Sequence, residues 1–304
     1  MHVVFGLRSA AESWPASTVC IGVFDGVHLG HQRVIAEAIS NAKQTERPCV
    51  VLTFDRHPAA FLRPDQCPPI ILPLGQKLRR LEAIGVDTAV VVPFDAELAS
   101  QSPEQFLQSC LVEKIHAKAV VVGHDFRFGK DRMGSGEWLA TRIETIIVGP
   151  HEIDGVRVSS SQIRKAISVG DVAAARKLLG EDFSLAGIVV PGNKFGRTIG
   201  IPTANLALLE TQAIPALGIY AGWASTDAGR FPAAISVGNR PTIEGAGFAI
   251  EAHLIGFSGE ELYGRDLLLS FTERLRDEER FESVNDMAAQ MREDVRAVES
   301  LVAN

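Results

Sequence analysis

The chain has 304 residues, of which 46% are hydrophobic and 22% are charged, so its composition is that of a globular protein and not of a disordered one. Domains usually hold ~100–200 residues, and this length therefore predicts two of them. The formal net charge of −7 argues against a broad surface for nucleic acid or anionic lipid, so neither is expected as a partner.

The first residues and the cysteines indicate a cytoplasmic protein. Residues 1–15 contain no basic stretch followed by an apolar core, and no apolar run approaches the ~20 residues that span a membrane. The cysteines are scattered over the first half of the chain without a C-x-x-C pair, which favours reduced structural thiols over disulfides or a zinc site. They are Cys20, Cys49, Cys67 and Cys110.

The first half of the chain alternates between two periodicities. Short β-branched runs without polar alternation predict buried strands at 18–24, 49–54, 88–92, 118–123 and 145–148. Helical spacing of apolar residues between them predicts helices at 31–44, 75–85 and 103–116. This alternation predicts an α/β domain, in which a parallel sheet carries helices on both faces.

The segment CIGVFDGVHLGHQ (20–32) places two histidines where the first of these strands gives way to a helix. We expect the strand to end at Phe24, with His28, Gly30 and His31 at the helix start, at the edge where α/β sheets bind ligands. Free amides and the helix dipole favour a phosphate there, and two imidazoles can stabilise its charge. The alternative is a pair of surface histidines, but the preceding G-x-F-D-G motif favours a nucleotide site. The other candidate ATP-binding residues here are Gly22, Phe24 and Asp25.

Three further motifs follow other strands of the same predicted sheet. They are TFDRHP (53–58), GHDFRFGKDRMG (123–134) and SSSQIR (159–164), the last of which opens a predicted helix. Hydroxyls and an arginine at a helix N-terminus suit a triphosphate. Each motif alone is compatible with a simple turn and cap, and their convergence on one edge favours a site. The candidate residues are His57, Asp125, Phe126, Phe128, Ser160, Ser161 and Arg164.

After about residue 184 the pattern changes. A short helix is expected at 168–180 as the connection. Beyond it, apolar runs separated by turns, with no helix between them, predict a small antiparallel sheet or barrel. The sequence therefore predicts domains at 1–183 and 184–304.

The chain closes with a predicted amphipathic helix. Ser283 is its candidate N-cap, and Asp286 occupies the capping-box position. The apolar stripe of this helix is interpreted as core packing and not as a cofactor site. It consists of Val284, Met287, Met291, Val295 and Val298.

The segment GIVVPGNKFGRTIGIPTANL (187–206) combines a glycine-rich loop with hard oxygen ligands. Loop amides can cradle phosphates, and the side-chain oxygens of Thr203 and Asn205 suit Mg²⁺. The glycine spacing is not that of a Walker loop, and no helix is expected after it. The alternative is a glycine-rich hairpin turn, against which the P-T-A-N sequence weighs. The candidate ATP-binding residues are Gly192, Lys194, Gly196, Arg197, Gly200 and Pro202.

Phosphorylation of an alcohol requires a group that accepts its proton. In FAIEAHLI (248–255), Glu251 and His253 alternate with apolar residues, so they share the face opposite the core. Glu251 is the candidate base. His253 is either a residue that orients the site or a histidine with a structural hydrogen bond only.

These motifs together resemble the bacterial bifunctional riboflavin kinase/FMN adenylyltransferase family, also called FAD synthetase. The resemblance runs nearly end to end. It is carried in order by GVFDGVHLGHQ, GHDFRFG, SSSQIR, GRTIGIPTANL, SVGNRPT, EAHLIGF, LYGRDL and LRDEERF. It implies a Rossmann-like adenylyltransferase domain followed by a riboflavin kinase β-barrel with a closing α-helix.

The resemblance also implies residue roles. His28 and His31 would serve AMP transfer, Thr203 and Asn205 would bind Mg²⁺ with ATP, and Glu251 would be the base of the kinase. The flavin in the kinase domain would contact Arg276, Glu278 and Phe281. In the first domain, His57, Asp125, Phe126 and Phe128 would serve the flavin side, and Ser160, Ser161 and Arg164 the phosphates. The chain departs from the usual family pattern at Arg56, Ser161 and Gly256.

The implied function has two steps with riboflavin, FMN and ATP as small-molecule substrates. The second domain would phosphorylate riboflavin to FMN, and the first would transfer AMP from ATP to FMN, giving FAD and pyrophosphate. One alternative is another H-x-G-H nucleotidyltransferase, which would leave residues 184–304 unexplained. Another is a catalytically silent flavin-binding regulatory protein, against which the joint presence of the candidate catalytic residues argues. The identity of the flavin rests on the resemblance alone.

Overall fold

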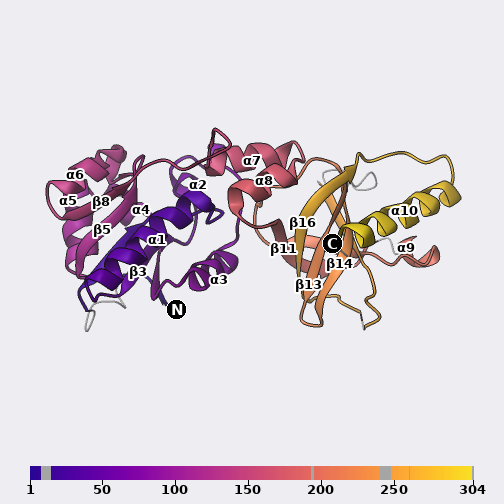
Figure 1. Cartoon of the computed structure of the whole chain (residues 1–304), viewed down its shortest axis with the longest axis horizontal. Helices are drawn as coiled ribbons and strands as arrows, with labels where there is room; N and C mark the ends of the chain where they lie inside the picture. Colours follow the sequence, from indigo (N-terminus) through magenta and orange to yellow (C-terminus); the bar gives the residue numbers. More distant parts are fainter. Residues whose placement is uncertain (8–14, 193–194, 240–247, 260, 303–304) are drawn as a thin grey trace. The chain divides into compact units, whose positions relative to one another are not determined.

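The structure is a computed structural model that describes residues 1–7, 15–192, 195–239, 248–259 and 261–302. Packing divides the chain into two compact units, Met1–Ser160 and Ser161–Asn304 (Figure 1). Within the described ranges, none of the helices has both the length and the apolar character needed to cross a membrane. The four cysteines are free thiols.

The first unit contains a six-stranded parallel sheet in the order β1-β4-β3-β2-β5-β8. Its strands are β1 (His2–Phe5), β2 (Ser17–Ile21), β3 (Cys49–Phe54), β4 (Thr88–Val92), β5 (Ala117–Gly123) and β8 (Glu144–Val148). The predicted α/β class is confirmed, and the edge strand β1 is an addition to the predicted set. Strands β3 and β4 extend the sheet on one side of β2, and the chain then crosses back to place β5 on the other side of β2. The carboxyl ends of β2 and β5 therefore form the switch point at which such sheets bind ligands.

The predicted helices of this unit are present with small shifts. They are α1 (Leu29–Gln44), α3 (Leu74–Ile84) and α5 (Pro103–Gln105), which continues as the π-helical segment η3 (Phe106–Val112). Short helical segments were not predicted: α2 (Pro58–Leu62), η2 (Pro64–Gln66), α4 (Ala96–Ser100), η4 (Lys130–Arg132) and α6 (Gly136–Ala140). Two small hairpins complete the unit, β6 (Arg127–Phe128) with β7 (Gly134–Ser135) and β9 (Glu152–Ile153) with β10 (Val156–Arg157).

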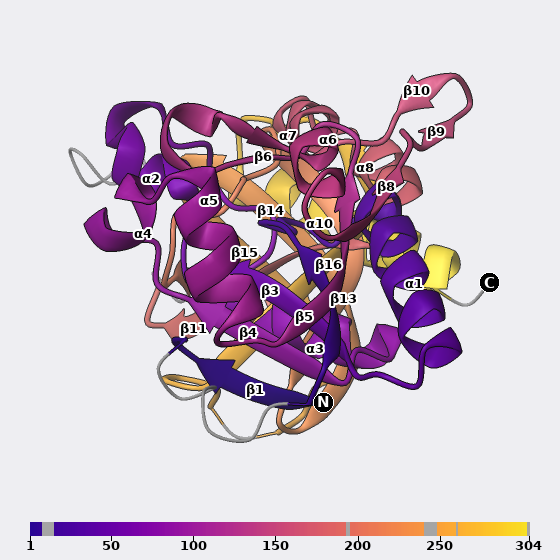
Figure 2. The same cartoon turned by 90° about the vertical axis from the view of Figure 1, so that its left-hand side faces the viewer.

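Helices cover both faces of the sheet because successive strand residues point to opposite sides. In β3, Val50 and Leu52 pack in one apolar layer with Leu107 of η3. Val51 packs in the other layer with Ile35 of α1. Figure 2 shows α1 and α3 on one side of the sheet and α5 on the other.

The second unit begins with two helices, α7 (Ser160–Ser168) and α8 (Val172–Leu179), in place of the single helix predicted at 168–180. Helix α8 packs against the barrel strands β11 and β16. Its buried residues are Val172, Ala175, Leu178 and Leu179. Packing therefore groups residues 161–180 with the barrel, whereas the predicted boundary lies after residue 183; that boundary stays a prediction.

The remainder of this unit is a closed antiparallel barrel in the order β11-β12-β15-β14-β13-β16. Its strands are β11 (Phe183–Val190), β12 (Ala204–Leu208), β13 (Gly218–Thr226), β14 (Gly229–Asn239), β15 (Phe248–Leu254) and β16 (Asp266–Arg276). The predicted barrel class is confirmed. The expectation that no helix interrupts this region was wrong, because the short helix α9 (Phe195–Thr198) lies in the glycine loop.

The closing helix α10 (Val284–Val302) begins as predicted. The backbone N–H of Asp286 donates to Ser283 Oγ at 3.1 Å, and the hydroxyl of Ser283 donates to Asp286 Oδ2 at 2.7 Å. The side chains therefore satisfy an N–H group at the helix start that has no partner within the helix.

Candidate active sites

The two histidines of the H-x-G-H motif lie against each other at the start of α1. His28 is the N-cap, and its Nδ1 accepts the backbone N–H of His31 at 3.2 Å. The rings stack with centroids 3.5 Å apart and an interplanar angle of 16°. Because His28 Nδ1 is an acceptor, the proton of a neutral His28 lies on Nε2.

His31 lies in a confined, positively charged environment. The ring of Phe24 meets it edge-on, with centroids 5.3 Å apart. Burial lowers the pKa of His31 well below 6.5, and the nearby His28 and Lys77 lower it further. His31 is therefore neutral at pH 7, and its buried Nδ1 makes no hydrogen bond within the part of the chain that the structure describes.

The turn before the histidines departs from the expected strand. Strand β2 ends at Ile21, so the predicted end at Phe24 was too late. Phe24 itself adopts φ +50°, a conformation that a strand does not allow. Its ring turns back over Gly22, where a Cβ would meet it at 2.8 Å. This close approach, which only glycine permits, helps to set the ring of Phe24 against His31.

Asp25 anchors this turn. Its carboxylate accepts the backbone N–H groups of Ile71 and Leu72, and its carbonyl accepts the hydroxyl of Ser160 at 3.0 Å. Gly30 lies close behind, and a Cβ there would meet the ring of His28 at 3.2 Å. Ser160 is thus held at the histidine turn.

Two basic residues of α3 reach the same turn, and neither was predicted. Lys77 is 6% exposed and its Nζ donates to the carbonyl oxygen of Val23 at 3.0 Å. Arg80 donates to the carbonyl oxygen of Gly26. The available signal was a lysine at helical spacing from Leu74 and Leu81, on a face otherwise expected to be apolar.

Among the flavin-side candidates of the first unit, His57 and Asp125 make polar contacts, whereas Phe126 and Phe128 form a stacked aromatic pair. His57 caps α2, with its Nδ1 accepting the N–H of Ala59 at 3.1 Å. Asp125 is exposed and pairs with Arg157 at 2.6 Å. Phe126 stacks on Phe128 with centroids 5.4 Å apart. Phe128 is itself buried in the core, so its ring supports Phe126 from below.

The three departures from the family pattern lie at exposed or unrestricted positions. Arg56 is exposed and pairs with the neighbouring Asp55 at 3.1 Å. Gly256 adopts φ +79° in the turn after β15, with no atom within 4 Å of its missing Cβ. Ser161 follows Ser160 in α7, the helix that also carries Arg164. Ser161 and Arg164 belong to the second compact unit, so their roles at the histidine turn stay predictions.

In the barrel, Asn205 of β12 and Glu251 of β15 come together with Thr203, which immediately precedes β12. Asn205 of β12 lies opposite Glu251 of β15 in the strand register. The hydroxyl of Thr203 donates to Glu251 Oε2 at 3.0 Å. Asn205 is buried, and a Cβ on Gly192 would lie 2.1 Å from its Nδ2. Glycine at 192 therefore lets the loop pass directly over Asn205.

The glycine loop folds back onto the segment that carries Thr203. A Cβ on Gly196 would meet the carbonyl oxygen of Ile201 at 2.2 Å, so only glycine fits there.

The other candidates of the loop make separate contacts. Arg197 pairs with Glu261 at 2.8 Å, and Gly200 adopts φ +78°. The carbonyl of Pro202 accepts a hydrogen bond from His253 Nδ1 at 2.8 Å. Lys194 lies outside the described residues.

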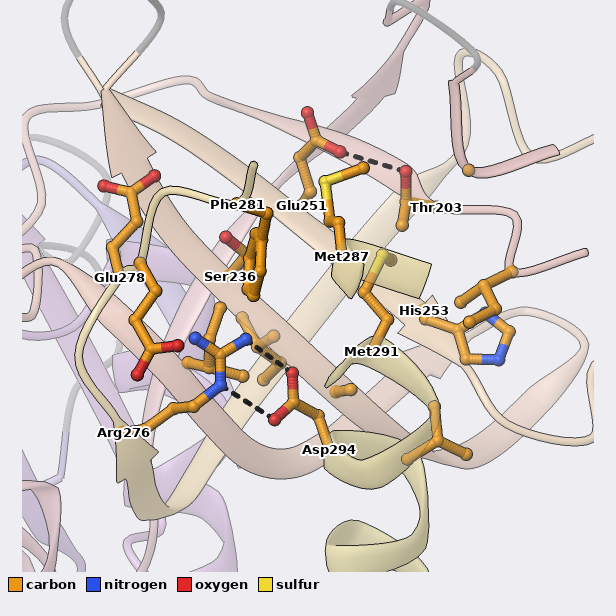
Figure 3. Close-up of a pocket in the computed structure, with 17 residues that line it drawn as sticks. Thr203, Ser236, Glu251, His253, Arg276, Glu278, Phe281, Met287, Met291 and Asp294 are labelled. Atoms are coloured by element: carbon orange, nitrogen blue, oxygen red, sulfur yellow. Dashed lines mark hydrogen bonds and ion pairs between the residues drawn. The ribbon is translucent and has the colours of Figure 1, made fainter. Parts of the chain in front are cut away.

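The Glu251–Thr203 pair opens into a cavity of ≈ 340 Å³ in the barrel unit (Figure 3). At another part of its wall, Arg276 of β16 makes a bidentate ion pair with Asp294 of α10, at 2.9 and 2.7 Å. The resemblance-based candidates Arg276, Glu278 and Phe281 all line this cavity. The structure therefore brings Thr203 and Glu251 into one pocket with Arg276, Glu278 and Phe281.

The interpretation of the α10 stripe as core packing was partly wrong. Val298 is fully buried, but Val284 is 53% exposed. Met287, Met291 and Val295 line the cavity. In Figure 3, Met287, Met291 and Phe281 lie between the Glu251–Thr203 pair and the Arg276–Asp294 pair. Helical spacing alone could not separate these roles, because one apolar stripe faces both the barrel and the cavity.

These features define a class of protein. A histidine pair at the switch point of a parallel sheet suits nucleotide chemistry, and a carboxylate beside oxygen ligands in a barrel cavity suits phosphoryl transfer. Residues 10–162 match the FAD synthetase family, and residues 179–302 match the riboflavin kinase family. The chain is thus a transferase with two nucleotide-dependent parts.

The chain belongs to the bifunctional riboflavin kinase/FMN adenylyltransferase family. It is 35% identical to the protein of that name from Haemophilus influenzae, with 97% of each chain covered. It is 33% identical to the Bacillus subtilis protein, with 97% of this chain and 95% of the relative covered. It phosphorylates riboflavin to FMN and adenylylates FMN to FAD. The riboflavin kinase match accounts for the region that another H-x-G-H nucleotidyltransferase would leave unexplained.

A solved structure shares the fold over both units. It is called a macrolide-efflux protein from Streptococcus pneumoniae and is 32% identical to this chain. The match has a TM-score of 0.89 and covers 98% of this chain and 99% of that one.

Proposed function

We propose that FMN is adenylylated at the histidine turn of the first unit and that riboflavin is phosphorylated in the barrel cavity of the second. The observation that carries the kinase assignment is the hydrogen bond between Thr203 Oγ1 and Glu251 Oε2, 3.0 Å long, at the wall of a cavity that also carries apolar side chains. A carboxylate beside hard oxygen ligands suits phosphoryl transfer, and an apolar wall suits a planar ring system.

Thr203 and Asn205 would hold Mg²⁺ together with the phosphates of ATP. Their hydroxyl and amide oxygens are hard ligands, and Mg²⁺ usually takes few protein ligands while keeping waters and phosphate oxygens. When bound, Mg²⁺ would neutralise charge on the phosphates. The glycine loop passes over Asn205, so its amides are available to the same phosphates, and Gly192, Gly196, Arg197, Gly200 and Pro202 form this ATP side.

Glu251 would accept the proton of the riboflavin hydroxyl. As that oxygen bonds to the γ-phosphorus of ATP, the bond to the leaving ADP breaks and the hydroxyl proton moves to the carboxylate. The hydrogen bond from Thr203 orients the carboxylate for this transfer. Phe281, Met287 and Met291 would contact the flavin ring, and Arg276 and Glu278 its polar groups.

The adenylyl transfer requires no comparable base, because FMN already carries an ionised phosphate. One phosphate oxygen of FMN bonds to the α-phosphorus of ATP, and pyrophosphate leaves. The Nε2–H of His28 and a ring nitrogen of His31 would stabilise the oxygens on which charge develops. Gly22, Gly30 and Ser160 shape the phosphate side, with Ser161 and Arg164 as further candidates, while His57, Asp125 and Phe126 would serve the flavin side.

Two single substitutions should separate the activities. Glu251→Gln keeps the shape of the side chain and a partner for Thr203, but it removes the base. We expect FMN formation from riboflavin to fall by on the order of 10²- to 10⁴-fold, with FAD formation from supplied FMN unchanged. His28→Asn should give the opposite result, with FMN accumulating and FAD formation falling by on the order of 10²-fold. Chromatography of riboflavin, FMN and FAD measures both.

The division of labour fails if either variant loses both activities equally while its melting temperature is that of the wild type. The Mg²⁺ requirement is tested by titrating Mg²⁺ into the metal-free enzyme with ATP and riboflavin. A kinase activity that is independent of divalent cations would contradict the assignment of Thr203 and Asn205. The cytoplasmic location of the protein stays a prediction.

A further inference from the structure

A lysine lies buried behind the histidine turn. Lys77 projects from α3 and is 6% exposed. Its Nζ donates to the carbonyl oxygen of Val23 at 3.0 Å and lies 3.4 Å from Thr53 Oγ1 and 3.5 Å from the carbonyl oxygen of Phe54. These acceptors follow β2 or end β3, so one ammonium joins the carboxyl ends of two neighbouring strands.

The buried charge is costly if packing is its only purpose. An ammonium removed from water is unfavourable unless oxygen atoms replace its hydration. Lys77 occupies the same helix face as Leu81, which is fully buried, so an apolar side chain would satisfy packing at this position. The oxygen atoms around Nζ replace the lost hydration of the ammonium because the strand ends hold them within reach of it. A charged side chain at this position is therefore explained better by a role at the histidine turn than by packing of the core.

The contacts of Lys77 lead directly to the histidines. Thr53 Oγ1 also donates to the carbonyl oxygen of Val23, at 3.1 Å. Val23 precedes Phe24, whose ring meets His31 edge-on. Movement of the Val23 carbonyl would therefore move Phe24 and the surface on which His31 rests.

We propose that Lys77 is a positioning residue of the adenylyltransferase site: its ammonium fixes the carboxyl ends of β2 and β3 and sets the positive field behind the histidine pair. This inference rests on the proposed role of that pair in AMP transfer. Lys77 acts through Val23, Phe24 and His31, and it does not itself contact the reacting phosphates.

The protonation of His31 supports this role. Burial is the largest cause of its lowered pKa, followed by the charges of His28 and Lys77. The other charged groups at the turn are Asp25, whose carboxylate is engaged by backbone amides, and Arg80, which donates to the carbonyl of Gly26. Loss of the Lys77 charge should therefore raise the pKa of His31.

The test uses the full chain with Lys77→Met, which removes the ammonium and keeps an unbranched side chain. The matched control is Arg79→Met, because Arg79 lies two residues after Lys77 on α3 but is exposed. We expect FAD formation from FMN to fall by on the order of 10- to 100-fold in Lys77→Met only. Riboflavin phosphorylation by the same chain should be unchanged. In NMR titrations, with the His31 signal identified by its loss in His31→Gln, the His31 midpoint should move upwards.

Unchanged FAD formation in Lys77→Met would overturn the inference. So would a loss of FAD formation that accompanies a lower melting temperature with the His31 midpoint unmoved, because the role would then be structural only. Lys77→Gln, which keeps a donor without the charge, provides a second variant if Lys77→Met does not fold, and it should show the same midpoint shift. His28→Asn distinguishes failure of the proposed function from failure of the lysine inference. Full FAD formation in His28→Asn would contradict the proposed role of the histidine pair. Loss of FAD formation in His28→Asn together with full FAD formation in Lys77→Met would contradict the lysine inference alone.

Discussion

His31 shows how strongly a side chain's chemistry depends on its surroundings. As a free imidazole it would be partly protonated near neutral pH. In the folded chain, burial lowers its pKa well below 6.5, and electrostatic interactions with His28 and Lys77 lower it further. The site therefore contains the neutral imidazole of His31 stacked on the imidazole of His28. Nδ1 of His28 already accepts a backbone N–H. Such a pair offers hydrogen-bond donors to phosphate without adding the charge of two imidazolium groups.

The same pKa shift predicts a pH dependence of stability. Below pH 6.5 the unfolded chain binds a proton at His31 that the folded chain does not, so the free energy of unfolding should decrease as the pH falls. Above pH 6.5 neither state binds that proton, and the contribution vanishes. We expect a slope of up to about 1.4 kcal/mol per pH unit from this group. Urea unfolding of the wild type and His31→Gln between about pH 5 and 8 measures it, since the variant should lack this part of the slope.

The exposed His2 provides the control for that experiment. His2→Gln should follow the wild-type curve. If His31→Gln also follows the wild-type curve, His31 does not have the lowered pKa.

His253 illustrates a choice that contacts decide. Its sequence position allowed either an orienting or a purely structural role. In the structure, Nδ1 donates to the carbonyl of Pro202, the residue before Thr203, while His253 also lines the barrel cavity. The bond is structural, and it holds the backbone that carries a proposed Mg²⁺ ligand.

Helix α10 combines two roles on one amphipathic element. Ala288 and Val298 are buried, whereas Met287 and Met291 line the cavity. Asp294 fastens the helix to the end of β16 through its bidentate pair with Arg276. The helix is therefore both the closing element of the unit and part of the wall of its cavity.

Removal of the Asp294 carboxylate should loosen this element. The side chains of Arg276 and Asp294 are only 17% and 7% exposed, so Asp294→Ala leaves a largely buried cation without its ion-pair partner. We expect a loss of about 3 kcal/mol in the free energy of unfolding of the second unit and a higher KM for riboflavin. Adenylylation of supplied FMN should persist. Urea unfolding and steady-state kinetics measure these effects.

Glu293→Ala is the matched control, because Glu293 is the exposed neighbour of Asp294 on α10. It should change the free energy of unfolding by no more than a few tenths of a kcal/mol and leave KM for riboflavin unchanged. Equal behaviour of the two variants would show that the ion pair does not hold the helix.

At the scale of the whole molecule, two compact units carry the two activities of the family. The helices between the predicted domains are part of this division. Helix α8 buries four apolar residues and packs on β11 and β16, so by packing it belongs to the barrel. A connection that looks like a linker in the sequence therefore contributes to a core.

A pair of fragments tests that assignment. Residues 161–304 should melt at a higher temperature than residues 181–304, which keep all of β11 but lack α7 and α8. The reason is the loss of apolar burial by α8, which amounts to several kcal/mol at about 1.5–3 kcal/mol for each large side chain. Differential scanning calorimetry and riboflavin kinase assays compare the two. Equal melting temperatures would support the boundary predicted after residue 183.

The sequence by itself determined the classes of both units and the motifs that are proposed to carry the chemistry. Buried parallel strands read as continuous β-branched runs, and half-buried barrel strands alternate, so the two sheet types were distinct before any contact was known. The H-x-G-H and P-T-A-N motifs are local, and their residues lie close together because they lie close in the chain. The pairing of Glu251 with Thr203, by contrast, depends on the register of β12 with β15.

Only the tertiary structure decided which side chains from distant segments join these sites. Lys77 comes from a helix far along the chain, and the predicted helix at 75–85 did not show which oxygen atoms would receive its ammonium. Met287 and Met291 belong to a stripe whose role depends on what faces it. Periodicity indicates that a side chain is turned away from water, but it does not indicate whether that side chain meets a core, a cavity or a set of polar oxygen atoms. That distinction is set by packing between elements, which local sequence does not encode.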